Sequence, residues 1–95
     1  MKMYVLAVSD DSAFMIELLK AFYTEEQALD AKDELTEARE EFFSKVKEYR
    51  KSQKSSNAEG WFNILCESRL NQLCPGINEC WFPDRIWTME VEVHE

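Results

Sequence analysis

The sequence is poor in the residues that mark flexible loops and nucleotide-binding turns. It contains only two glycines and two prolines in 95 residues. Gly60 and Gly76 stand alone, so the chain lacks a glycine-rich loop of the kind that cradles phosphate groups. With 45% hydrophobic and 13% aromatic residues, the composition also argues against a disordered chain. We expect a single folded domain spanning residues 1–95, because a chain of this length has no room for two cores.

Long apolar runs are missing as well. Crossing a bilayer as a helix takes about 20 apolar residues, and the longest candidate here, residues 13–23, is interrupted by Glu17 and Lys20. The N-terminal residues have neither the apolar stretch nor the small-residue cleavage site of a signal peptide. These absences predict a cytoplasmic protein.

Basic residues are scarce relative to acidic ones. Lysine and arginine total 11 against 19 aspartates and glutamates, and the formal net charge is −8. Direct binding to nucleic acid requires clustered lysines and arginines, and anionic membranes select the same residues. We therefore expect neither association. An acidic surface suits solubility alone or a basic protein partner, such as a nucleic-acid-handling enzyme.

Histidine is nearly absent, and the three cysteines are irregularly spaced. Cys66, Cys74, Cys80 and His94 offer the ligand types of a zinc site, but the cysteines form no Cys-x-x-Cys pair. The single histidine lies beside the C-terminus, where chains fray, and is poorly placed for a general base. We predict no catalytic residues, no metal and no cofactor. A Cys/His zinc or redox protein stays as an alternative.

Three segments carry strand patterns. Residues 3–8 are apolar on both parities, which indicates a strand covered on both faces or a central strand. Residues 14–23 fit a helix or a strand, and the strand is favoured because Thr24 begins a capping box that ends at Gln27. Residues 87–94 alternate apolar and polar side chains, predicting a half-buried edge strand with a polar outer face.

A long amphipathic helix over residues 25–53 is the strongest pattern in the chain. Its apolar residues recur every three or four positions: Ala28, Ala31, Leu35, Ala38, Phe42, Val46 and Tyr49. At 1.5 Å per residue the helix would be about 40 Å long, which is long for a small sheet to cover. We therefore expect another element to pack on its far end.

A shorter helix is predicted for residues 59–73, and Pro75 and Gly76 follow it closely. The side chains expected to face inward from it are Phe62, Leu65, Cys66, Leu70 and Leu73. The fold prediction is α+β, in the order β-β-α-α-β. A small, mainly antiparallel sheet packs against one long amphipathic helix.

Charge is divided unevenly along the predicted long helix. Residues 25–41 contain eight acidic side chains against Lys32 and Arg39, whereas residues 42–57 contain five basic side chains and one acidic one. The helix dipole favours this polarity without any functional reason. The acidic part nevertheless forms the candidate partner-binding surface: Glu26, Asp30, Asp33, Glu34, Glu37, Glu40 and Glu41.

These observations favour a non-enzymatic protein-binding protein that inhibits or modulates a partner enzyme. Carboxylates spaced along a helix resemble a phosphate backbone and would occupy a cationic groove, although Lys32 and Arg39 interrupt the series. Size, charge and organisation are typical of small accessory and anti-defence proteins encoded by phages. The alternative is a homo-oligomeric protein built on the long helix, with a homodimer as its simplest form.

Overall fold

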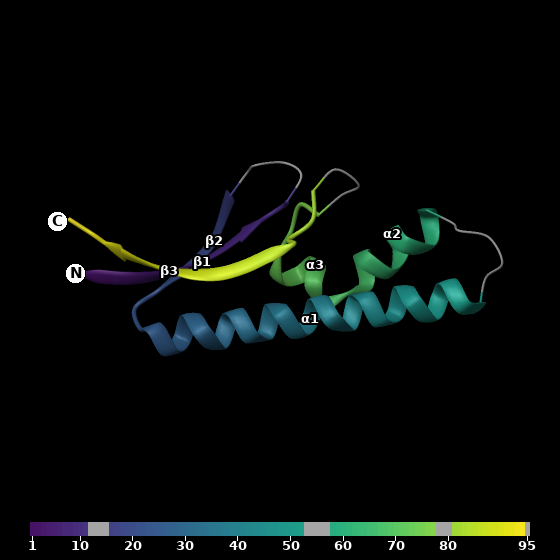
Figure 1. The fold of residues 1–95 in the computed structure, drawn as a ribbon, viewed down its shortest axis with the longest axis horizontal. Helices are drawn as coiled ribbons and strands as arrows, with labels where there is room; N and C mark the ends of the chain where they lie inside the picture. The colour runs from purple at the N-terminus through teal and green to yellow at the C-terminus, as the bar shows by residue number, and fades with distance from the viewer. Residues whose placement is uncertain (12–15, 53–57, 78–80, 95) are drawn as a thin grey trace.

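The computed structural model describes residues 1–11, 16–52, 58–77 and 81–94. The elements follow in the order β1 (Lys2–Ser9), β2 (Ile16–Phe22), α1 (Glu25–Ser52), α2 (Ala58–Glu67), α3 (Arg69–Leu73) and β3 (Arg85–Glu92). The molecule is elongated, with extents of 56 × 24 × 17 Å. This arrangement confirms the predicted α+β class, a small antiparallel sheet packed on one long helix (Figure 1).

The sheet has the strand order β2-β1-β3, and both pairings are antiparallel. The central position of β1 explains its apolar residues on both parities. The pairing of β1 with β2 shifts register between Leu6 and Ala7, so that Leu19 opposes no residue of β1. The described part of residues 14–23 is thus a strand, as predicted, while residues 14 and 15 lie outside the described residues.

Helix α1 begins where the capping pattern predicts. Thr24 accepts a hydrogen bond on its side-chain oxygen from the backbone N–H of Gln27, at 3.2 Å. This bond satisfies one of the amide groups that have no partner within the helix. The helix then continues for 28 residues, about 42 Å at 1.5 Å per residue.

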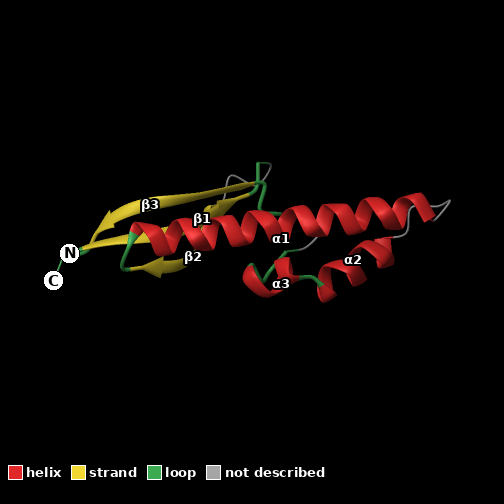
Figure 2. Ribbon diagram, turned by 90° about the horizontal axis from the view of Figure 1, so that it is seen from below, coloured by secondary structure: helices red, strands yellow, loops and turns green. Residues whose placement is uncertain are grey.

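Helix α1 covers one face of the sheet with its first half, and α2 and α3 pack on it beyond the sheet (Figure 2). The apolar stripe of α1 is buried, with Leu35 and Phe42 among the largest fully buried side chains. Phe42 contacts Trp61 edge-on, with ring centroids 5.5 Å apart, and lies 6.0 Å from the ring of Phe82. The expectation that another element packs on the far end of the long helix is therefore confirmed.

The predicted second helix is divided in two. Ser68 separates α2 from α3 because its side chain caps α3, accepting a hydrogen bond from the backbone N–H of Asn71. The inward positions are only partly as predicted. Leu65 and Leu70 are buried, but Cys66 is exposed and Phe62 is 51% exposed.

The alternation in β3 is present, but the predicted orientation is wrong. Ile86 and Thr88 oppose Val8 and Leu6 of β1, which belong to the core beneath α1. Successive side chains of a strand point to opposite faces, so Trp87, Met89 and Val91 face away from the helix. Thr88, Glu90 and Glu92 lie on the helix side together with Ile86, and Trp87, Met89 and Val91 lie on the outer side.

Candidate functional site

The seven candidate acidic residues lie together on α1, and all seven are exposed. At about 100° per residue they fall on an arc of roughly 120°, on the side of the helix that faces away from the sheet. We call this surface the acidic face. It extends from Glu26 to Glu41, about 22 Å along the helix axis.

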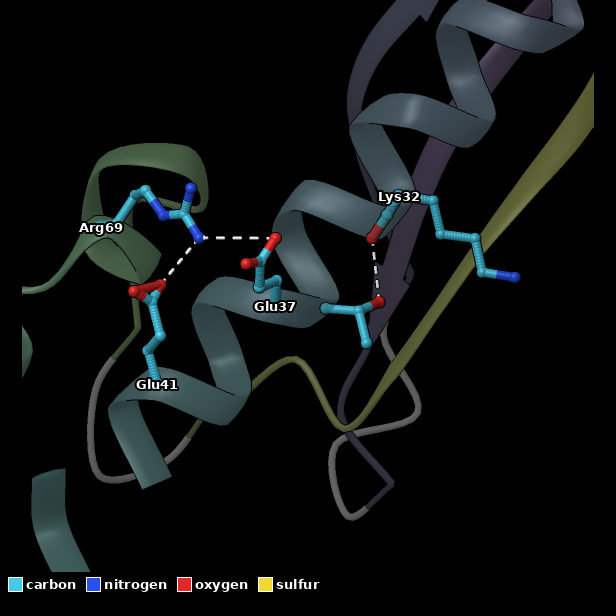
Figure 3. Close-up of polar contacts among 5 residues, drawn as sticks. Lys32, Glu37, Glu41 and Arg69 are labelled. Carbon is cyan, nitrogen blue, oxygen red and sulfur yellow. Dashed lines mark hydrogen bonds and ion pairs between the residues drawn. The ribbon is translucent and has the colours of Figure 1, made fainter. Parts of the chain in front are cut away.

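The two basic residues that interrupt this series in the sequence do not lie on the acidic face. Arg39 points to the opposite flank of α1, where it donates hydrogen bonds to the carbonyl oxygens of Pro83 and Asp84, at 3.1 and 2.9 Å. Lys32 extends away from Glu37 and Glu41 (Figure 3). The acidic face is therefore continuous in space, which the sequence order alone does not reveal.

One basic side chain from another element does reach the acidic face. Arg69 of α3 forms an ion pair with Glu41 at 2.7 Å and a longer one with Glu37 at 4.0 Å (Figure 3). All three side chains are at least 40% exposed, so these pairs contribute little to stability. Among the described residues, no ion pair is formed by the other five: Glu26, Asp30, Asp33, Glu34 and Glu40.

The cysteines and the histidine do not form a metal centre within the described part of the chain, where no group of three or more ligating residues occurs. Cys74 is buried, and burial raises the pKa of its thiol to about 12, with a smaller contribution from the carboxylate of Glu17. A thiol with such a pKa stays protonated at neutral pH and is a poor nucleophile. Cys66 is exposed, and Cys80 lies outside the described residues.

A buried carboxylate occurs at the end of β1, where it has a structural role. Asp10 is 7% exposed and accepts a hydrogen bond from the backbone N–H of Phe82 at 2.7 Å. Beside it, the carboxylate of Asp84 accepts a hydrogen bond from the N–H of Asp11, which in turn pairs with Arg85 at 2.8 Å. These contacts join the segment before β3 to the end of β1.

A hollow of about 510 Å³ lies at the same end of the sheet. Its lining consists of Ser9, Ile16, Arg85, Ile86 and Trp87. None of the described residues that line it is a histidine, a cysteine or a carboxylate able to activate Ser9 as a nucleophile.

The outer face of the sheet was not singled out by the sequence patterns, and the structure leaves it open. It consists of the residues that alternate away from α1: Met3, Val5, Ala7, Ser9, Ile16, Leu18, Ala21, Arg85, Trp87, Met89 and Val91. Ile16 and Leu18 are 62% and 59% exposed. No described helix covers this side (Figure 1).

No protein-family model matches the sequence, and no curated protein or solved structure is significantly similar to it. None of the described helices is long and apolar enough to cross a membrane. The functional argument therefore depends on the two exposed surfaces, the acidic face and the outer face.

Proposed function

We propose that this protein is a non-enzymatic protein-binding protein that presents the acidic face of α1 to a cationic surface of a partner enzyme. The observation that carries the proposal is the continuity of seven exposed carboxylates on one side of a long helix. Packing against the sheet and against α3 holds the helix in place, so the charges keep a fixed spacing.

The spacing of these charges suits a groove that binds nucleic acid. Seven carboxylates over about 22 Å give roughly one charge per 4 Å of axis, close to the 3.4 Å per phosphate along one DNA strand. A rigid series of charges steers association with a cationic groove and competes with the nucleic acid for it. The protein would then act as an inhibitor or modulator, as small accessory and anti-defence proteins of phages do.

Two further features agree with this role. Cys66 and Cys74 are both free thiols, which fits a protein working in the reducing cytoplasm. In addition, Arg69 neutralises only the end of the acidic face near Glu41, so the stretch from Glu26 to Glu34 retains its full charge.

Capture of basic nucleic-acid-handling enzymes by the tagged protein, with and without excess duplex DNA, tests the proposal. The triple variant Asp30→Asn, Asp33→Asn, Glu34→Gln should lose at least about tenfold in affinity, because it removes three charges that Arg69 does not pair with. A control with the same change in net charge is Glu48→Gln, Glu67→Gln, Glu92→Gln, which leaves the acidic face intact.

The wild-type complex should dissociate in high salt and in excess duplex DNA, since exposed charges are screened and the DNA occupies the same groove. Capture that is unaffected by duplex DNA, or that both triple variants weaken equally, would contradict the proposal.

A further inference from the structure

The outer face of the sheet carries almost no charge, although the chain as a whole has a formal charge of −8. Among the described strand residues on this face, Arg85 is the only charged one, and Asp11 pairs with it at the end of the sheet. The charged residues of β2 and β3, such as Glu17, Lys20 and Glu90, occur at positions that alternate to the other side. The acidic character of the protein is therefore absent from this surface.

All three strands contribute apolar side chains to the outer face. A central strand with apolar residues on both parities is typical of sheets that are covered on both sides. Here α1 covers only one side, and Leu18 and Ile16 remain more than half exposed. Val91 is 38% exposed, whereas Ala7 at the centre of the face is buried by its neighbours. A partly exposed apolar face of this kind is typical of an interaction surface.

We propose that the outer face binds the outer face of a second copy of this chain, forming a symmetric dimer in which two sheets pack between two α1 helices. Two antiparallel sheets pack face to face about 10 Å apart, and the same patch serves on both copies. This proposal does not rest on the proposed function, because it uses a different surface.

The charge distribution favours a second copy as the occupant. In a face-to-face dimer each acidic face lies on the outside, so the two α1 helices are separated by roughly 30 Å, given a sheet spacing and a helix diameter of about 10 Å each. That separation is several times the Debye length of about 8 Å at physiological ionic strength. Repulsion between the two acidic chains is therefore largely screened, and the surfaces that meet are neutral.

The size of the outer face sets the strength of the dimer. The three strands have eight, seven and eight residues. Spaced about 4.8 Å apart and rising about 3.3 Å per residue, they give a footprint of roughly 360 Å² per copy before side-chain relief is counted. The exposed side chains of Met1 and Val93, at the strand ends, enlarge it. Two copies together bury a footprint of about 720 Å², below the roughly 1,200 Å² of specific, stable interfaces, so the dimer is expected to be weak and to dissociate on dilution.

The test is sedimentation velocity of the full chain from about 1 µM to about 500 µM, in the range expected for weak complexes. The wild type should shift from monomer to dimer as concentration rises, and added salt should strengthen the dimer by screening the remaining repulsion. A monomer throughout the range would overturn the proposal, and so would a dimer that salt weakens. The latter would indicate pairing of the acidic half of α1 with its basic half.

The variant Leu18→Lys should raise the dimer dissociation constant at least about tenfold, since it places an ammonium group in the interface. The matched control is Phe62→Lys, which makes the same change in charge at an exposed apolar side chain on α2. Both variants make the chain less acidic by the same amount, so a loss of association specific to Leu18→Lys cannot come from the change in net charge and must arise at the interface. Val91→Lys on β3 is a second variant of the outer face, with circular dichroism as the check that each protein folds. Equal effects of Leu18→Lys and Phe62→Lys would overturn the proposal.

Discussion

The acidic face of α1 and the outer face of the sheet lie on opposite sides of one core and differ in the physical basis of any association. On the acidic face, exposed carboxylates attract a partner over distance, and salt weakens the attraction. On the outer face, neutral side chains such as Leu18 and Trp87 associate only at contact, and salt does not weaken them. Salt dependence therefore separates the two surfaces without any substitution.

Charged side chains are distributed unequally between the two faces of the sheet. Strand β3 carries Glu90 and Glu92 at the end of the sheet, on the side that α1 covers, whereas its Trp87, Met89 and Val91 face out. Lys2 pairs with Glu90 at 3.1 Å on that same side. Charge is thus concentrated towards α1, and the opposite face is nearly neutral.

The largest expected effect on the free energy of unfolding comes from opening a cavity in the hydrophobic core that lies between the two surfaces. Phe42 is fully buried between α1, α2 and the segment before β3, so Phe42→Ala should lower the free energy of unfolding by about 3–5 kcal/mol. Denaturant unfolding measures this change. The neighbouring Phe43 is 51% exposed, and Phe43→Ala should cost less than about 1.5 kcal/mol. Similar losses for Phe42→Ala and Phe43→Ala would show that Phe42 does not hold together the core that lies between the acidic face and the outer face.

A smaller effect is expected from the junction that holds the end of the outer face. Asp10→Ala removes the buried acceptor of the Phe82 N–H and should lower the free energy of unfolding by about 1–3 kcal/mol. The control is Asp11→Ala, whose partner Arg85 is exposed and whose loss should cost less than about 1 kcal/mol. Thermal or denaturant unfolding measures both. Equal losses would mean that the buried hydrogen bond has no special role in positioning β3.

The sequence predicted the long helix, its cap at Thr24 and the antiparallel sheet because these depend on local patterns. It predicted the wrong side of β3 as the covered one, since alternation identifies two faces without saying which one a helix will pack on. The usual assumption that the apolar face points inward fails here, where Ile86 alone supplies much of β3's contact with the core. Exposed Phe62 and Cys66 were misplaced because the predicted stripe was centred on the wrong side of α2. The side chains of α2 that pack on the core are Trp61, Ile64 and Leu65, and each of the two misplaced residues lies about 100° farther round the helix.

The sequence predicted that the seven acidic residues lie along one long helix, but it did not predict that they form a continuous surface. Lys32 and Arg39 occur within the series, and only the positions of these side chains around the helix show that they lie off the acidic face. Arg69 had no such signal, because 28 positions separate it from Glu41 and a helix break brings it into contact. Contacts of this kind depend on tertiary packing that single-sequence patterns do not contain.

The smallest expected effect on stability, and the one that best sharpens the comparison, comes from Arg69. Replacing it by glutamine removes two exposed ion pairs, so the free energy of unfolding should change by less than about 1 kcal/mol. The acidic face becomes more negative at the end near Glu41, and association with a cationic partner should become about twofold faster at low salt, with the difference lost at high salt. Stopped-flow or surface-binding kinetics measure the rate.

Arg50→Gln is the control, because it makes the same change in charge on α1 beyond the acidic face. Dimerisation through the outer face should be the same for both variants, since Arg69 and Arg50 lie on helices that the dimer leaves outside. If Arg69→Gln slowed partner association, or altered the dimer as much as Leu18→Lys does, the two surfaces would not be independent.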